Sequence, residues 1–231
     1  MLARARLRPL LALVIAVALF VAAGPSTAER HVRFADPRLE AAVRAALGAP
    51  TGALGPDLLA QLTELHVTGS EIALLGGIEA CPNLRTLDLA NNHISDLAPL
   101  AGLEELETLV LRSNQVEDVG PLAGLRELRK LDLDWNTVED VSPLAELRRL
   151  EFLGLWGSRV RDLSPLAGLA ALTELGLSAC PIEDPAPISR LTNLRWLGIP
   201  NTGVRDLAFL RPLVKLERLS LGENGIEDVS P

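Results

Sequence analysis

The sequence predicts an α/β solenoid, in which short parallel strands stack into one sheet and short helical turns cover the opposite side. Apolar residues recur every 22 residues, in copies that begin at positions 62, 84, 106, 128, 150, 172, 194 and 216. A fixed period of this length is typical of repeat architectures. Each copy opens with the spacing L-x-x-L-x-L, which fits a short strand, and most carry a proline fifteen residues after the first leucine, which favours the start of a helical turn.

The first leucines of each copy explain why the copies must stack. A single coil cannot bury its three inward leucines, whereas coils stacked about 4.8 Å apart turn them into continuous apolar columns. Eight residues after the first leucine, several copies carry an asparagine such as Asn92, whose amide can satisfy backbone groups freed at the turn. Other copies place Ser158, Cys180 and Thr202 there, so we expect this ladder of amides to be weakest from 158 to 202.

An aspartate and a proline follow the asparagine position and mark the turn on the convex side. Asp96 and Pro99 are examples in the second copy. The carboxylate can accept hydrogen bonds from freed N–H groups, and the fixed φ of proline suits the first residues of a 3₁₀ or helical turn. We therefore expect the sheet on the concave side and short 3₁₀ or helical turns on the convex side.

The repeat also carries a family resemblance. The unit LxxLxLxxNxIxDLxPLxxL resembles the 22-residue leucine-rich repeat of bacterial internalins and of related protein phosphatase regulatory subunits. This resemblance covers residues 62–231 and implies a leucine-rich repeat solenoid. It implies little about function, because the positions that define the motif are structural.

Two segments precede the repeats. Residues 1–28 resemble a signal peptide, since three arginines precede a 14-residue apolar run that ends before a small-residue cleavage site at 26–28. The alternative is an uncleaved anchor, although the run is too short for an ordinary membrane span. Residues 29–61 contain two short helical patterns, the first beginning at Asp36 and Pro37, and we expect them to form a cap over the first coil.

The charge and the far end of the chain limit the possible partners. Loss of residues 1–28 would remove three arginines and change the net charge from −8 to −11, which argues against nucleic-acid or anionic-membrane binding. The last repeat stops at Pro231, two thirds of the way through a coil. We expect either a longer gene product or an end covered by a partner or a second copy, because open strand edges favour association.

No pattern predicts catalysis, a metal or a cofactor. Asp132 and Asp134 are neighbouring carboxylates, but no histidine or cysteine lies near them in sequence, and an open strand face should leave their pKa values unperturbed. The three histidines lack metal-ligand spacing. Cys81 and Cys180 lie four to five coils apart, roughly 20 Å, too far for a disulfide, and we expect both to be buried free thiols.

The aromatic residues predict a binding site. Six aromatics follow residue 28, and four of them, Trp135, Phe152, Trp156 and Trp196, fall at positions expected to lie on the concave face or its rim. Large rigid aromatics are typical of binding hot spots.

Glycines and charges surround these aromatics. Gly154, Gly176 and Gly198 should leave a lane without side chains, although the rings could instead lie flat over these glycines and only shield them. The remaining candidate residues form a polar rim: Arg112, Lys130, Asp132 and Asp134.

The sequence therefore predicts a secreted, periplasmic or cell-surface recognition module that binds a protein, or a glycan, through its concave face without catalysis. Two alternatives remain open. One is a regulatory subunit or inhibitor that binds an enzyme, as the phosphatase-binding relatives do. The other is a structural protein that associates with itself through its C-terminal end.

Overall fold

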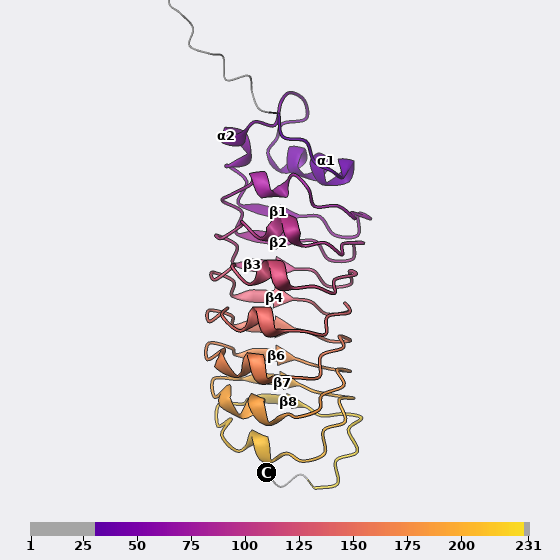
Figure 1. Cartoon of the computed structure of the whole chain (residues 1–231), viewed down its shortest axis with the longest axis vertical. Coiled ribbons are helices and arrows are strands. Elements are labelled where there is room, and N and C mark those ends of the chain that lie inside the picture. The colour runs from indigo at the N-terminus through magenta and orange to yellow at the C-terminus, as the bar shows by residue number, and fades with distance from the viewer. Residues whose placement is uncertain (1–30, 229–231) are drawn as a thin grey trace, which may run out of the picture.

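The computed structural model describes residues 31–228, which form a solenoid with one parallel sheet. Figure 1 shows the strands stacked along one side and the helical turns along the other, with α1 and α2 at the N-terminal end. The sheet contains eight strands in the order of the sequence: β1 (Glu64–His66), β2 (Thr86–Asp88), β3 (Thr108–Val110), β4 (Lys130–Asp132), β5 (Phe152–Gly154), β6 (Glu174–Gly176), β7 (Trp196–Gly198) and β8 (Arg218–Ser220).

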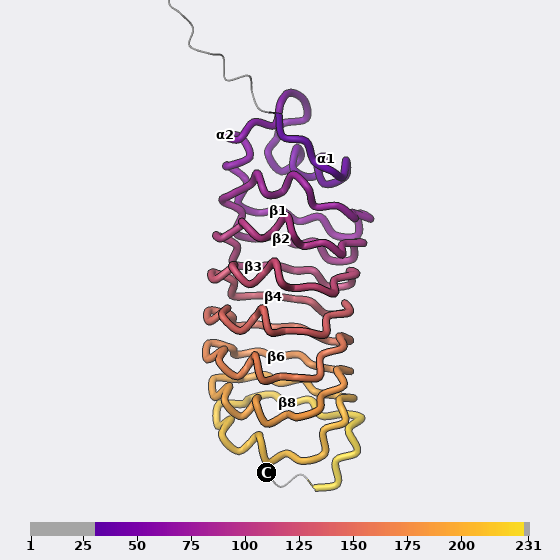
Figure 2. Tube along the Cα trace, in the orientation of Figure 1, coloured from indigo at the N-terminus to yellow at the C-terminus, as the bar shows by residue number. Residues whose placement is uncertain are grey.

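Residues that are 22 apart in the sequence pair across neighbouring strands. Leu87 of β2, for example, lies opposite Leu109 of β3, and the same register holds in all seven strand pairs. Figure 2 shows that each coil superposes on the next. The predicted α/β solenoid with leucine-rich repeats is confirmed.

The opposite side consists of 3₁₀ turns, most of which have proline in their first turn, as predicted. At these turns the aspartate carboxylates accept backbone hydrogen bonds, as Asp96 Oδ1 does from the N–H of Ala98 at 2.8 Å. The turns are η1 (Ile78–Ala80), η2 (Ala98–Leu100), η3 (Gly120–Leu122), η4 (Ser142–Leu144), η5 (Ser164–Gly168), η6 (Ala186–Arg190) and η7 (Ala208–Leu210).

Leucines from every coil fill the space between the strands and the turns. Leu131 and Leu153 are fully buried, as are nearly all leucines at equivalent positions up to β7. Cys81 and Cys180 are buried and free, in agreement with the prediction. Burial raises the pKa of Cys180 to about 12 and that of Cys81 to about 11.

The asparagine ladder is present but interrupted. The Asn136 amide donates to the carbonyls of Leu111 at 2.9 Å and Leu133 at 3.0 Å, and its oxygen accepts from the N–H of Val116 at 2.9 Å. One coil later, the buried Ser158 hydroxyl has no hydrogen-bond partner. The predicted weakening is therefore concentrated at this serine.

At the next two ladder positions, Cys180 and Thr202 make some of the hydrogen bonds that an asparagine makes in other coils. The Cys180 thiol donates a weak hydrogen bond to Leu155 at 3.1 Å. The Thr202 hydroxyl donates to the carbonyl of Ile199 at 2.9 Å, and the Thr202 N–H donates to Asn224 Oδ1 at 2.8 Å. Contrary to the prediction, the weak region ends before Thr202.

Helix α1 (Pro37–Ala46) and the short α2 (Pro56–Leu59) lie over the first coil (Figure 1). The Asp36 side chain caps α1 by accepting from the N–H of Arg38 at 2.9 Å, and it also accepts from the N–H of Ala73 in the first coil at 3.2 Å. Leu39 and Val43 of α1 are fully buried against the repeats. The predicted signal peptide, residues 1–28, lies outside the described residues.

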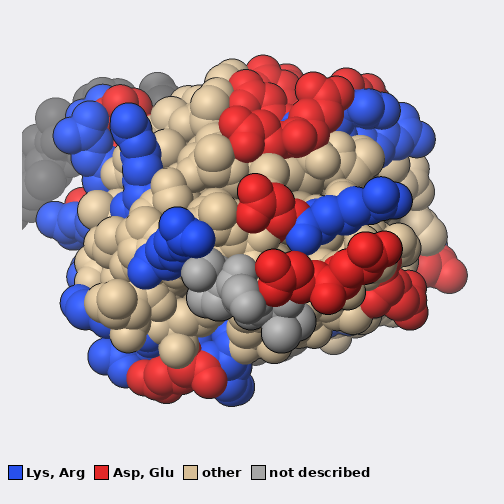
Figure 3. All heavy atoms as spheres, turned by 90° about the horizontal axis from the view of Figure 1, so that it is seen from below, with Lys and Arg blue, Asp and Glu red and all other residues tan. Residues whose placement is uncertain are grey.

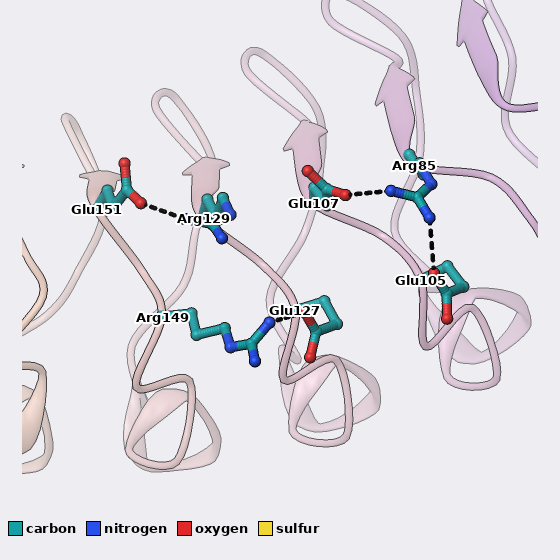
Figure 4. A network of polar contacts seen from close by, with 7 residues as sticks. All are labelled: Arg85, Glu105, Glu107, Glu127, Arg129, Arg149 and Glu151. Carbon is teal, nitrogen blue, oxygen red and sulfur yellow. Dashed lines mark hydrogen bonds and ion pairs between the residues drawn. The ribbon is translucent and has the colours of Figure 1, made fainter.

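Charged pairs link neighbouring coils just before the strands. Arg85 contacts Glu107 at 2.8 Å and Glu105 at 3.2 Å, and Arg129 contacts Glu151 at 2.6 Å. Figure 4 shows these pairs, together with Glu127 and Arg149, running from coil to coil. Each exposed pair contributes well under about 1 kcal/mol, so the row stabilises the register only collectively.

Candidate functional site

The candidate site lies on the outward face of the sheet, which we call the sheet face: the outward residues of the strands and of the turns that directly follow them. Phe152 and Trp196 belong to β5 and β7. Trp135 and Trp156 follow β4 and β5 in the turns that leave the sheet. The four predicted aromatics thus come from two strands and two turns of coils four, five and seven.

Trp135 and Trp156 form a pair. Their ring centroids are 4.9 Å apart with the planes tilted by 39°, and their exposed fractions are 46% and 40%. Tryptophan side chains are on average largely buried in folded proteins, so two adjacent indoles with this exposure form an unusual apolar surface.

The backbone of Trp135 has an unusual conformation. Its φ is +57°, in the left-handed region that costs a residue with a side chain about 1–2 kcal/mol. The equivalent residues of the other coils have the same conformation: Gly69, Asn91, Ser113, Gly157, Ala179, Asn201 and Glu223. The left-handed backbone is thus a property of the repeat, and Trp135 is the largest side chain that occupies this position.

Trp196 lies differently from the pair. A Cβ placed on Gly198 would approach the Trp196 ring to 2.9 Å, and one on Gly176 would approach it to 3.4 Å. The benzene ring of the indole therefore covers two of the three glycines. The expectation of an empty lane is wrong here, because the ring fills the space that the missing side chains leave, as the alternative interpretation anticipated.

The third glycine is covered by carboxylates. A Cβ on Gly154 would lie 2.7 Å from Asp134 Oδ1 and 3.2 Å from Asp132 Oδ1. Asp134 Oδ1 accepts a hydrogen bond from the N–H of Trp156 at 2.8 Å, and Asp132 Oδ1 accepts one from the N–H of Asp134 at 3.0 Å. Asp134 thereby links the fourth coil to the Trp156 turn.

The burial and the pKa of Asp134 differ from what the sequence predicts. Its side chain is only 14% exposed, and burial raises its pKa, with a further increase from the neighbouring charge of Asp132. The hydrogen bond from Trp156 and the charge of Arg112, 3.9 Å away, act in the opposite direction. The expectation that an open strand face leaves this carboxyl unperturbed is wrong, because the adjacent Gly154 lets it sink toward the backbone.

The remaining predicted residues lie around this centre. Lys130 is exposed and places Nζ 5.3 Å from the centroid of the Phe152 ring, while Phe152 itself is half-buried. Arg112 lies beside Asp134. Among the described residues, neither Phe152 nor Trp196 makes a ring contact with the Trp135–Trp156 pair, so the four aromatics form one pair and two separate rings.

One residue of this face was missed in the sequence. Glu174 of β6 is directly opposite Phe152 of β5 on one side and Trp196 of β7 on the other. The 22-residue period already places Glu174 between these two aromatics, because residues 152, 174 and 196 occupy the same position of successive repeats.

Figure 3 views the solenoid from its C-terminal end. Acidic and basic patches alternate around its circumference, with uncharged residues between them. Over residues 31–228, no helix is long and apolar enough to cross a membrane.

Two family models match the sequence: "Leucine rich repeat" at residues 82–138 and "Leucine Rich repeats (2 copies)" at residues 60–102. Solved structures extend this match. An internalin (inlF) from Listeria monocytogenes shares 30% identity with a TM-score of 0.66, and the match covers 85% of this chain and 72% of that one. For an internalin C2 (inlC2) from the same organism, identity is 34%, the TM-score is 0.68, and the coverages are 81% and 94%.

The chain belongs to the internalin-like leucine-rich repeat family. This internalin-like protein also has the fold of a leucine-rich repeat protein from Leptospira interrogans, with 24% identity, a TM-score of 0.59, and coverage of 72% of this chain and 50% of that one. No curated protein matched its sequence. The fold is generally a protein-binding module, and the family is typically non-catalytic.

Proposed function

We propose that this protein is a secreted, periplasmic or cell-surface recognition module that binds a protein partner on its sheet face. Trp135 and Trp156 are the central anchors. Phe152 and Trp196 extend the apolar surface, and the charged residues around them orient the partner: Arg112, Lys130, Asp132 and Asp134.

The observation that carries the proposal is the exposed Trp135–Trp156 pair. Two rings 4.9 Å apart leave 46% and 40% of their surfaces open to solvent. In addition, Trp135 is the largest side chain at a position where the other coils carry glycine, asparagine, serine, alanine or glutamate. Large exposed aromatics are typical hot spots.

Localisation follows from the N-terminal segment. If residues 1–28 direct export, protein recovered from the medium or the cell envelope will begin near Glu29. N-terminal sequencing tests this part of the proposal, and intact chains found only in the cytosol would contradict it.

The binding site is tested with a double variant, Trp135→Asn and Trp156→Ser. Both new residues occur at the equivalent positions of other coils, as Asn201 and Ser178, so the variant should fold. Val214→Ser is the matched control, because Val214 is an 86% exposed apolar residue elsewhere on the chain.

The assay is capture of secreted and cell-surface proteins by the immobilised full chain, followed by mass spectrometry. We expect at least one protein to be captured by the wild type and the control and to be lost with the double variant. Each hot-spot aromatic should contribute at least about 1–2 kcal/mol, so the combined loss of affinity should exceed tenfold. Equal capture of every partner by a folded double variant would show that the pair is not the binding site.

A further inference from the structure

The centre of the sheet face contains a carboxylate without an ionic partner. Glu174 is half-buried between Phe152 and Trp196, its neighbours in the strand register. None of the ion pairs among residues 31–228 involves Glu174. An acidic group beside two aromatic rings is therefore available to a charge from outside the chain.

Other carboxylates near Glu174 add to the excess of negative charge on the sheet face. Asp132 and Asp134 belong to the coil of β4, two strands from Glu174, and lie over Gly154 of the intervening β5. Arg112 lies 3.9 Å from Asp134. In coils four to seven, the outward positions carry three carboxylates and one cation, Lys130. The net charge at these positions is thus −2, on a chain whose overall charge is −8, and Arg112 and Arg218 lie in the coils on either side.

The same column of the sheet already holds one cation over an aromatic ring. Lys130 Nζ lies 5.3 Å from the Phe152 centroid, within the range of a cation–π interaction. Trp196 offers a second ring, whose benzene part lies over Gly176 and Gly198. Within the described part of the chain, no cation lies over that ring, although tryptophan is the aromatic that attracts cations best.

We propose that the sheet face binds a basic segment of its protein partner, and that a lysine or arginine of this segment lies between Phe152 and Trp196 with its charge on Glu174. This inference rests on the proposed function, because it assigns the chemistry of the partner at the same face. A cation there gains an ion pair with Glu174 and lies near the two aromatic rings that neighbour Glu174 in the strand register. It also lowers the mutual repulsion of Glu174, Asp132 and Asp134.

The ends of the column restrict the partner further. Lys130 of β4 and Arg218 of β8 each lie two strands from Glu174. They repel a second positive charge on either side. The surface therefore selects an isolated basic residue flanked by neutral or acidic ones, and not a polybasic run.

The chain provides its own reporter for a test. Its three tryptophans all lie on or beside the sheet face, so the indole N–H signals in a nuclear magnetic resonance spectrum report this face alone. The probe is a short glycine–serine peptide with blocked ends and one central arginine. A second peptide with norleucine in place of arginine keeps the aliphatic chain and removes the charge.

We expect the arginine peptide to shift the Trp196 indole signal saturably, more than the Trp135 and Trp156 signals, and to bind more weakly at higher salt. Glu174→Gln should weaken this binding about three- to tenfold. The matched control is Glu139→Gln, which removes the same charge from an exposed glutamate off the sheet face. It should leave binding unchanged.

Three results would overturn the inference: no shift of the Trp196 signal at millimolar arginine peptide, equal binding of the norleucine peptide, or equal binding by Glu174→Gln. Each would refute a cationic partner without touching the proposed function. Loss of partner capture in the Trp135 and Trp156 variant would still support a binding face. Conversely, an unaffected capture assay would refute the anchors even if the peptide bound at Glu174.

Discussion

Replacing Ser158 with asparagine should stabilise the protein, because it restores a missing member of the buried ladder. The Ser158 hydroxyl is buried without a hydrogen-bond partner, which costs about 1–3 kcal/mol for a polar group of this kind. By analogy with Asn136, an asparagine at 158 would donate to the carbonyls of Leu133 and Leu155 and accept from the N–H of Val138. Each such hydrogen bond contributes about 0.5–1.5 kcal/mol net.

The larger side chain must fit beside Cys180, whose thiol already donates to the Leu155 carbonyl. Allowing for this competition, we expect Ser158→Asn to raise the free energy of unfolding by about 1–3 kcal/mol. The reverse change, Asn136→Ser, should lower it by about 2–4 kcal/mol, because three hydrogen bonds are lost inside the core.

Urea denaturation followed by tryptophan fluorescence measures both changes, since Trp135 and Trp156 lie in the same two coils. With a slope of about 2 kcal/mol per molar urea, Ser158→Asn should move the midpoint upward by about 0.5–1.5 M. An unchanged or lower midpoint for Ser158→Asn, together with an unchanged midpoint for Asn136→Ser, would refute the view that ladder amides stabilise the turns.

Three further predictions concern titratable groups. The raised pKa of Asp134 means that its ionised form is disfavoured in the folded state, which destabilises the protein at neutral pH and no longer does so once pH falls below that pKa. Asp134→Asn should therefore leave the free energy of unfolding at neutral pH unchanged or higher, and urea titrations at acidic pH should show that this free energy depends less on pH. The pKa of Asp140 is lowered by hydrogen bonds from the Ser142 N–H and hydroxyl, so its contribution to stability is lost as pH falls through the folded pKa, and Ser142→Ala should raise that pKa in a carboxyl titration followed by nuclear magnetic resonance. Cys81 and Cys180, with pKa values raised by burial to about 11 and about 12, should resist aromatic disulfide reagents in the native protein and react only at the rate of unfolding; rapid labelling at neutral pH would contradict their burial.

Most of the fold could be predicted because the 22-residue period determines both the strand register and the core. Leu131 and Leu153 pair and are buried as their spacing requires. The aspartate caps follow equally directly, since the carboxylate two residues before a turn accepts from its first N–H in coil after coil.

Side-chain positions on the sheet face were less predictable, because they depend on the orientations of neighbouring side chains and not on sequence spacing. The period placed Trp196 and Gly198 on the same face, but not the indole over the glycine. It placed Asp134 on the rim, but not its burial against Gly154. The left-handed backbone of Trp135 could have been inferred from Asn91, Gly157 and Asn201 at the equivalent positions.

Charge pairing between coils was only partly predictable. One position on the rim carries charges of alternating sign in successive coils, which favours a continuous row of surface ion pairs: Glu139, Arg161, Glu183, Arg205 and Glu227. Among the described residues only Arg161 and Glu183 pair there, at 3.3 Å. The row in Figure 4 forms instead beside the strands, where the hydrogen-bonded strand pairing fixes the spacing between coils.

This row gives the solenoid a parity. Arginine and glutamate alternate over four successive coils at Arg85, Glu107, Arg129 and Glu151, so the charge pattern of this segment repeats every 44 residues and not every 22. Excision of residues 106–127 alone would set Arg85 against Arg129, whereas excision of residues 106–149 would set Arg85 against Glu151. Within this segment, loss of these two coils therefore keeps opposite signs together where loss of one coil does not.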